Sequence, residues 1–388
     1  MHPFARRVSA IAPFEVMEVL GLARELEHGG ADVIHLEVGE PDFATPEPVR
    51  EAARRAVCDA PMTYTSGIGL IELREAIARW YHDIFRVTVD VDRIVVTTGS
   101  SAALLLALGA CVNSGDRVLM GDPAYPCNRN FARLFDAEPI LVPTDSGSAY
   151  QLTADQIRVR ATPDTSAVIV ASPANPTGTL VADDAWDGLI AACDSIGATL
   201  IVDEIYQGLV YGRSPHTVLA HTDQVVVVNS FSKYFQMTGW RVGWLVVPPG
   251  WTRHIETLAQ NLFICPPTPS QHAAVAALSP ECAPILDARR REFANRRDVL
   301  LRELPRTGLV VDAVPDGAFY VYADTRAIAD DSFAMVRDLL SAQGVALTPG
   351  RDFGDHAPDT HVRIAYTQPV PRLLEAIQRI VRWRSETG

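Results

Sequence analysis

The sequence predicts an α/β fold in which helices cover a mostly parallel β-sheet. Short runs of β-branched residues alternate with helical stretches along most of the chain. The 388 residues are enough for a large core and usually for two domains. A hydrophobic content of 48% with 21% charged residues is typical of a soluble globular protein.

Six apolar runs predict the strands of the main sheet. Each run is short, and turn residues or a helical stretch separate it from the next. In chain order the runs are 93–97, 117–120, 167–171, 199–203, 225–229 and 244–247, and a helix at 101–111 follows the first. This alternation of strand and helix indicates parallel strands.

The last part of the sequence predicts a smaller second unit. A long charged helix, rich in arginine, is expected at 287–304 and links the two units. Strands are expected at 318–322, 345–347 and 361–365, and an amphipathic helix at 373–383 closes the chain.

Charge and cysteine content narrow the choice of partner and compartment. A net charge of −13 argues against a nucleic acid or an anionic membrane surface as the partner. The six cysteines show no CxxC spacing, so we expect reduced thiols in the cytoplasm. No apolar stretch approaches the roughly 18 residues of a membrane span. Glu15 and Glu18 interrupt the N-terminal segment, so we expect no signal peptide.

Lys233 is the only lysine in the chain, and all the other residues among the 34 basic ones are arginines. A guanidinium keeps its proton and cannot supply a free amine. An ε-amine with a lowered pKa can form a Schiff base with a carbonyl. The sequence therefore predicts that Lys233 acts as a nucleophile; the simple alternative is a leftover surface lysine.

Polar residues and glycine follow the predicted strands at the point where each strand ends. Ligands in open α/β sheets bind in the crevice outside these carboxyl ends. The residues in question are 99–101, Tyr125, Asn175, Asp203 and 230–233. Their order along one sheet indicates a single binding site.

A lysine that holds an aldehyde cofactor usually serves pyridoxal phosphate. This cofactor needs a carboxylate that keeps the pyridine nitrogen protonated, an anion site for the phosphate, and an apolar or aromatic face for the ring. Asp203, at the end of an apolar strand, fits the carboxylate, because a buried carboxylate requires a positive partner. The alternative for Asp203 is a helix N-cap.

Two further features suit the phosphate. Gly99, Ser100 and Ser101 precede an apolar helix, whose free N–H groups and dipole attract an anion. Arg241, which follows Lys233 closely, could grip the phosphate through two hydrogen bonds. Tyr125 could stack on the ring. Taken one at a time, these residues also fit simpler roles, namely serine capping, a surface arginine and a packed tyrosine.

Together the motifs resemble those of the class I/II aminotransferases, which are fold-type I pyridoxal-phosphate enzymes of the aspartate aminotransferase superfamily. The resemblance covers nearly the whole chain. Its motifs are LEVGEPDF (36–43), YTSGIGLIELR (64–74), ASPANPTG (171–178), VDEIY (202–206), SFSK (230–233), GWRVG (239–243) and VRIAY (362–366). The implied fold is a large domain with a sheet of the seven-stranded type at 46–285. A small α+β domain would combine both chain ends, 1–45 with the N-terminal arm and 286–388.

The resemblance also implies a role for each site residue. Lys233 would hold the cofactor as an internal aldimine and then move the substrate proton, with Asp203 and Tyr206 as the other catalytic residues. Asp203 would pair with the pyridine nitrogen, and Asn175 and Tyr206 with the ring hydroxyl. The other cofactor-binding residues would be Gly99, Ser100, Ser101, Tyr125, Ser230, Ser232 and Arg241, with Tyr64 reaching the cofactor of a neighbouring subunit. Arg363, Gly39 and Asn175 would bind the substrate.

The implied reaction moves an amino group between an L-amino acid and a 2-oxo acid by a ping-pong mechanism, in a homodimer with shared active sites. A β-eliminating C–S lyase on the same scaffold is the main alternative, because it would use the same residues. An aminotransferase-like regulatory domain is another. We expect no helix-turn-helix extension, however, because the sequence opens on the family's arm, and its charge disfavours DNA.

Two other classes have little support in the motifs. Gly67 and Gly69 do not form a dinucleotide fingerprint, because Glu72 stands where the third glycine belongs. The histidines show no HExxH spacing, so no metal site is expected.

The side chain of the amino donor is the open question. Related users of dicarboxylates in one subgroup place a lysine near position 101, where this chain has serine. The neighbouring candidates are apolar or aromatic, namely Ile11, Phe14, Tyr125 and Phe263. We therefore expect a neutral donor side chain, apolar or aromatic; an arginine from another loop is the alternative.

Overall fold

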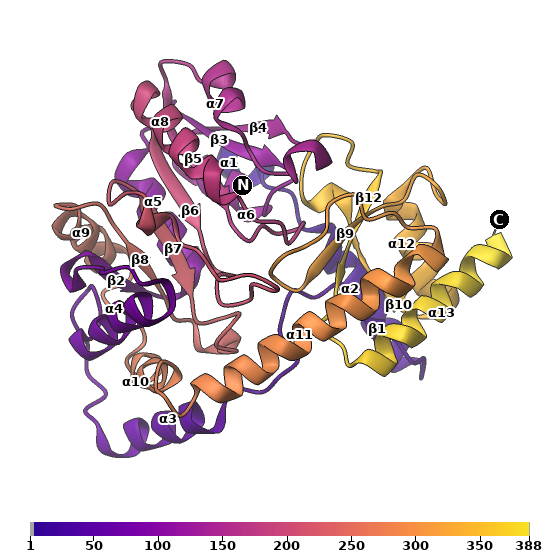
Figure 1. The fold of residues 1–388 in the computed structure, drawn as a ribbon, viewed down its shortest axis with the longest axis horizontal. Coiled ribbons are helices and arrows are strands. Elements are labelled where there is room, and N and C mark those ends of the chain that lie inside the picture. The colour runs from indigo at the N-terminus through magenta and orange to yellow at the C-terminus, as the bar shows by residue number, and fades with distance from the viewer. Residues whose placement is uncertain (1–3, 388) are drawn as a thin grey trace.

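The computed structural model describes residues 4–387, which are built around one sheet of seven strands (Figure 1). The strands are β2 (Ile94–Thr97), β3 (Arg117–Asp122), β4 (Glu138–Pro143), β5 (Thr165–Ala171), β6 (Thr199–Asp203), β7 (Val226–Ser230) and β8 (Gly243–Val246). Their spatial order is β2-β8-β7-β6-β5-β3-β4. Strand β8 runs opposite to the other six strands, which all share one direction, so the prediction of a mostly parallel sheet is confirmed.

All six strands predicted for this sheet are present, with bounds that differ by at most two residues. The seventh strand, β4, was not among the predicted runs. It begins Glu138-Pro139 and ends at Pro143, and proline weakens the pattern of a strand. Proline is tolerated there because β4 lies at the edge of the sheet.

Helices cover both faces of this sheet, and a separate hydrophobic core lies under each layer (Figure 1). The helices are α3 (Glu47–Asp59), α4 (Ile71–Phe85), α5 (Gly99–Cys111), α6 (Cys127–Leu134), α7 (Ala154–Arg160), α8 (Trp186–Ile196), α9 (Thr252–Leu262) and α10 (Thr268–Ala277). Helix α5 packs against β7 and β8 on one side and α9 on another, which explains why it is apolar all round.

A smaller part of the molecule combines both ends of the chain. Strand β1 (Ile34–His35), near the start of the chain, pairs in parallel with β10 (Val345–Ala346) near its end. Strands β9 (Tyr320–Asp324), β11 (Thr348–Pro349) and β12 (His361–Ala365) form an antiparallel sheet beside them. Helices α2 (Glu15–His28), α12 (Ser332–Gln343) and α13 (Val370–Thr387) pack around these strands, and a short α1 (Arg6–Ala10) precedes them.

The strand predicted at 318–322 lies two residues further on, as β9. Ala318 has a positive φ of 58°, and its N–H bonds to the carbonyl of Leu209 rather than to β12. The strand can therefore start only after this turn.

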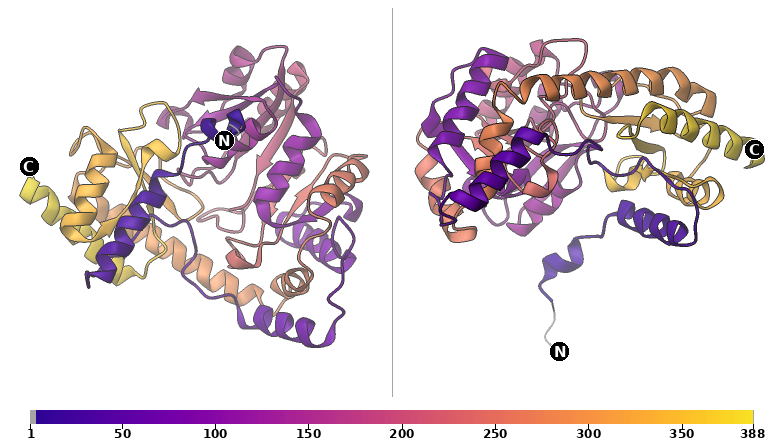
Figure 2. Two further views of the ribbon diagram at one scale, coloured as in Figure 1. Left: turned by 180° about the vertical axis from the view of Figure 1, so that it is seen from behind. Right: turned by 90° about the horizontal axis from the view of Figure 1, so that it is seen from below.

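Helix α11 (Ala283–Glu303) runs from the large sheet to the smaller part, as predicted for a linking helix (Figures 1 and 2). Figure 2 also shows the N-terminal segment reaching away from α2 toward the side of the large sheet. The domain limits 1–45, 46–285 and 286–388 stay a prediction.

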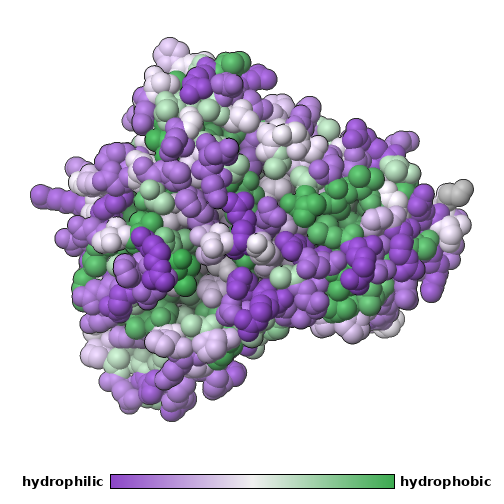
Figure 3. All heavy atoms as spheres, viewed as in Figure 1, coloured by the Kyte–Doolittle hydropathy of each residue, from purple (hydrophilic) through white to green (hydrophobic). Residues whose placement is uncertain are grey.

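Hydrophilic side chains cover much of the face seen in Figure 3, and apolar side chains gather over the region of β9 and α12. Within residues 4–387, no helix is long and apolar enough to cross a membrane. All six cysteines are free.

Candidate active site

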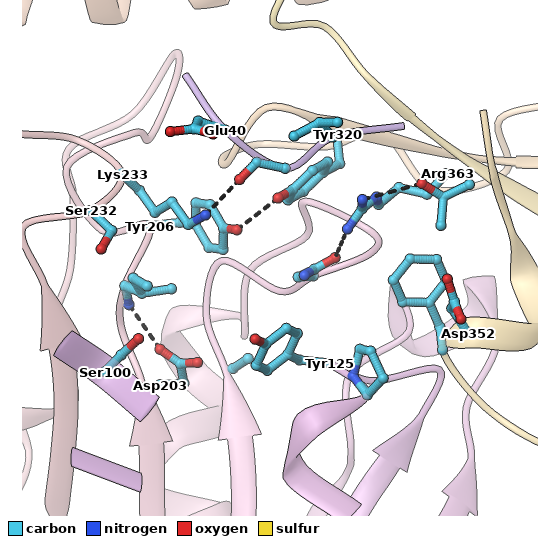
Figure 4. A pocket seen from close by; sticks show the side chains of 18 of the residues that line it. Glu40, Ser100, Tyr125, Asp203, Tyr206, Ser232, Lys233, Tyr320, Asp352 and Arg363 are labelled. Atoms are coloured by element: carbon cyan, nitrogen blue, oxygen red, sulfur yellow. Dashed lines mark hydrogen bonds between the residues drawn. The ribbon is translucent and has the colours of Figure 1, made fainter. Parts of the chain in front are cut away.

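A cavity of about 390 Å³ lies beyond the carboxyl ends of the parallel strands, between the large sheet and the smaller part (Figure 4). Most of the residues predicted for the site line it. They are Gly39, Ser100, Ser101, Tyr125, Asn175, Asp203, Tyr206, Ser232, Lys233, Arg241 and Arg363. The fold thus brings strand ends from one part together with Arg363 on β12 of the other.

Three predicted site residues lie outside this lining. Ser230 is buried behind the wall, where its Oγ lies 3.0 Å from Oγ of Ser232. Gly99 has a positive φ of 76° and lies against the guanidinium of Arg241, which a side chain at position 99 would displace. Tyr64 is 79% exposed on the surface before α4. The first two support residues of the wall, whereas Tyr64 makes no contribution to the cavity of its own chain.

Lys233 follows β7, and its Nζ donates a hydrogen bond to the carbonyl of Gly39 at 2.6 Å (Figure 4). Burial lowers the pKa of Lys233 to about 8, and the charge of Arg363 adds to this effect. A lowered pKa increases the fraction of free amine near neutral pH, which a nucleophilic lysine needs. This position does not fit a leftover surface lysine.

Asp203 is buried at the end of β6 and faces the same cavity. Burial raises the pKa of its carboxyl to about 6. One oxygen accepts the N–H of Ile205 at 3.0 Å, so Asp203 also caps the turn after β6. No helix begins at this turn, so the alternative of a helix N-cap is wrong. The carboxylate still gains from a cation in the cavity, because one backbone hydrogen bond only partly offsets its burial.

The start of α5 and Arg241 bring together groups that could bind an anion. Ser100 and Ser101 stand in the first turn of α5, and Thr98, the residue before the helix, makes no side-chain cap. The first N–H groups of α5 therefore stay available for an anion. Arg241 adds a positive charge beside them, with its Nη1 3.0 Å from the carbonyl of Thr238.

Arg363 is buried on the opposite side of the cavity. Its guanidinium donates to the carbonyl of Glu37 at 2.6 Å, to Thr348 at 3.2 Å and to Oδ1 of Asn175 at 3.0 Å. These acceptors are neutral. The guanidinium also stacks over the ring of Tyr320, 4.3 Å from its centroid. A buried guanidinium with only neutral partners can still bind a carboxylate.

Tyr320 is a site residue that the sequence reasoning missed. Its hydroxyl lies 2.9 Å from that of Tyr206, and the ring supports Arg363. A side chain at Gly39 would collide with the Tyr320 hydroxyl, which explains the glycine there. Tyr320 stands in a predicted strand, but only the pairing of β9 with β12 brings it to the site.

The remaining wall is largely apolar and comes from both chain ends. Phe14 and Val16 contribute from the start of α2, and Phe353 from the loop before β12. Phe14 was among the predicted neighbours of the substrate, whereas Ile11 and Phe263, also predicted, lie outside the lining. Phe263 packs instead against the core under α5 and α9.

These groups fit pyridoxal phosphate. The cavity offers one lysine with a lowered pKa, one buried carboxylate, an anion site at a helix start and an aromatic ring, Tyr125. Each answers one need of the cofactor: a covalent link, a partner for the pyridine nitrogen, a seat for the phosphate and a face for the ring. Fold and site together define a pyridoxal-phosphate enzyme.

The chain belongs to the class I and II aminotransferases. The sequence model of the family "Aminotransferase class I and II" matches residues 31–380. The protein is therefore a pyridoxal-phosphate-dependent aminotransferase, which confirms the resemblance seen in the motifs.

Individual relatives agree with this assignment. Valine–pyruvate aminotransferase of Mycobacterium tuberculosis is 42% identical over 377 residues, which is 97% of each chain. The (5-formylfuran-3-yl)methyl phosphate transaminase of Methanocaldococcus jannaschii is 35% identical over 97% of this chain and 98% of its own. A crystal structure of an aminotransferase from Mycobacterium tuberculosis superposes with a TM-score of 0.95 at 41% identity and covers both chains fully.

Proposed function

We propose that this aminotransferase takes its amino group from an L-amino acid with a neutral side chain, apolar or aromatic, and passes it to a 2-oxo acid by a ping-pong mechanism. One observation carries the choice of donor. The cations in the lining of the cavity are Lys233, Arg241 and Arg363, and each has another task. An acidic donor side chain would lose its hydration without gaining a cation. The similarity to a relative named for valine and pyruvate supports this choice.

Lys233 is the residue that we propose binds the cofactor covalently, because it is the only lysine and reaches into the cavity. When bound, pyridoxal phosphate supplies an electron sink for the electrons of the substrate Cα–H bond. The amine of Lys233, once free, would take the proton from Cα. Its lowered pKa suits that task, because a base works best with a pKa near the operating pH.

The other residues would hold the reacting groups in place. Asp203 would keep a proton at the pyridine nitrogen, and Asn175 and Tyr206 would bond to the ring hydroxyl. The turn at Ser100 and Ser101, with Arg241 and Ser232, would hold the phosphate, while Gly99 and Ser230 support this site from behind. Arg363 would bind the substrate carboxylate, with help from the backbone at Gly39. Binding at both ends would orient Cα toward Lys233.

A comparison of amino donors tests this proposal. We expect kcat/KM for leucine, phenylalanine or methionine to exceed that for aspartate by at least roughly tenfold, since a buried, unpaired carboxylate costs more than 1.4 kcal/mol. Pyruvate and 2-oxoglutarate serve as acceptors. As a control, Arg363→Gln should lower kcat/KM for every donor alike, because all donors share the α-carboxylate. A clear preference for aspartate would contradict the proposal.

We also propose a homodimer in which Tyr64 completes the site of the partner subunit. Its exposure and its place outside the cavity lining of its own chain support this role. Two-fold dimers are also the commonest homo-oligomers. Six free cysteines support a cytoplasmic location for the enzyme.

Hybrid dimers test the shared site. Tyr64→Ala and Lys233→Ala should each be nearly inactive alone. Refolded together in equal amounts, they should regain about a quarter of the wild-type activity, because half of the dimers are hybrids with one intact site of two. The double variant in one chain, refolded with wild type, is the control for subunit exchange. No regained activity despite exchange, or a fully active monomer by sedimentation, would count against this role of Tyr64.

A further inference from the structure

Asp352 is a buried carboxylate in the cavity wall that the mechanism above does not use. It follows β11 and is only 4% exposed. Its Oδ1 accepts the N–H of Glu15 at 2.7 Å, and its Oδ2 accepts the N–H of Val16 at 2.9 Å. Residues more than 330 positions apart in the chain therefore meet at this point.

These two hydrogen bonds cap helix α2 from outside. The residue before α2 is Phe14, which has no side chain able to cap, so the first N–H groups of the helix would otherwise lack partners. A carboxylate at this end also suits the positive pole of the helix dipole. Asp352 thus fixes the place where α2 begins.

The start of α2 is also the apolar wall of the cavity. Phe14 and Val16 stand on either side of the capped residue Glu15, and both line the cavity. Because Asp352 binds the backbone of Glu15 and Val16, it sets how closely these apolar side chains approach the cavity. Through these hydrogen bonds, the segment that carries Asp352 holds the apolar residues at the start of α2 in the cavity wall.

The charge of Asp352 acts on the same space. Figure 4 shows Asp352 on the side of the cavity where Arg363 lies, away from Lys233. Burial raises the pKa of Asp352, but the N–H groups of Val16 and Glu15 and the charges of Arg363 and Arg129 oppose this rise and favour the carboxylate. The like charge of Asp352 would repel a negative donor side chain that enters this space.

We infer that Asp352 is a specificity-determining positioning residue, which holds Phe14 and Val16 against the donor side chain. Its negative charge also disfavours the binding of donors with acidic side chains. This inference rests on the proposed function, because it concerns the donor of that reaction. It goes beyond the argument that no further cation lines the cavity to pair with an acidic donor side chain, because it assigns the discrimination against such donors to one residue. A role as a helix cap alone would predict no effect on the choice between donors.

Binding of acids that lack an amino group tests the inference without turnover. The probes are 4-methylpentanoate, glutarate and propanoate, which correspond to leucine, glutamate and alanine, and calorimetry on the holoenzyme gives their Kd values. We expect the wild type to bind 4-methylpentanoate more tightly than glutarate. Asp352→Asn retains one acceptor oxygen and removes the charge. The ratio of the Kd for glutarate to the Kd for 4-methylpentanoate should therefore fall by roughly tenfold or more.

Asp352→Ala separates the cap from the charge. We expect the backbone amides at 15–19 to exchange hydrogen faster in this variant, because the start of α2 has lost its partner. Binding of 4-methylpentanoate should weaken by about tenfold, whereas propanoate, too short to reach Phe14 and Val16, should change less. Thr153→Ala is the matched control: Thr153 caps α7 on the large part, away from the cavity. It should speed exchange in α7 and leave all three Kd values unchanged.

Two results would overturn the inference. One is an unchanged ratio of 4-methylpentanoate to glutarate in Asp352→Asn. The other is an equal loss of affinity for all three acids in Asp352→Ala. A wild-type holoenzyme that transfers no amino group from any donor would refute the proposed function instead, and the acid-binding ratios would still decide the role of Asp352.

Discussion

Borohydride reduction of the cofactor-loaded enzyme is expected to abolish the only internal cut that a lysine-specific protease can make. The chain contains one lysine, Lys233, so cleavage after residue 233 should yield two fragments. Reduction would fix the cofactor on this amine, and the protease would no longer recognise the modified side chain. Mass spectrometry of the denatured digest should show one intact chain that carries the added mass of the cofactor.

The unreduced enzyme, denatured and digested in parallel, is the control and should be cut completely. Normal cleavage after reduction would show that the cofactor is not bound to Lys233. The substitution Lys233→Arg adds a kinetic test. It keeps a positive charge near the carbonyl of Gly39, but a guanidinium can neither bond to an aldehyde nor accept the Cα proton. Turnover should fall by at least roughly a thousandfold, with the thermal unfolding midpoint little changed.

Asp203→Asn is expected to lose most of the activity while still binding the cofactor. An asparagine oxygen can still accept the N–H of Ile205, so the cap of the turn after β6 is preserved. The charge that would hold a proton at the pyridine nitrogen is lost, and such a charge-assisted contact is commonly worth about 3 kcal/mol. We therefore expect kcat to fall roughly a hundredfold, with cofactor absorbance and Lys233 labelling retained.

Glu204→Gln provides a matched control one residue away. Glu204 is also a fully buried carboxyl, but it accepts hydrogen bonds from Thr217 and Val218 and lies outside the cavity lining. Burial raises its pKa to about 8, so glutamine resembles its protonated form. This variant should keep near-normal turnover. A comparable loss in both variants would mean that Asp203 acts only as a buried structural group.

Much of the site could be predicted because its residues follow the strands directly. Asp203 ends an apolar run, and Lys233 stands three residues after β7, so their places depend on local sequence. Their convergence needs only the general rule that ligands bind beyond the carboxyl ends of parallel strands. Ser230 shows the limit of this reasoning, because its side chain turns behind the wall toward Ser232.

The residues that were missed depend on contacts between distant segments. Tyr320 reaches Arg363 and Tyr206 through the pairing of β9 with β12 and the docking of both against the large sheet. Neither event leaves a local pattern, since any apolar run in the smaller part fits several pairings.

The sequence by itself determined the alternation of strands and helices, the single lysine and the residues at the strand ends. These depend on the period of apolar residues and on the chemistry of individual side chains. Only the tertiary structure decided the setting of two groups that line the cavity: Arg363, whose hydrogen-bond partners are all neutral, and Asp352, which is bound to the start of α2. The physical reason is that burial and long-range hydrogen bonds set the charge and position of such groups, and both arise only when the chain ends pack against the large sheet.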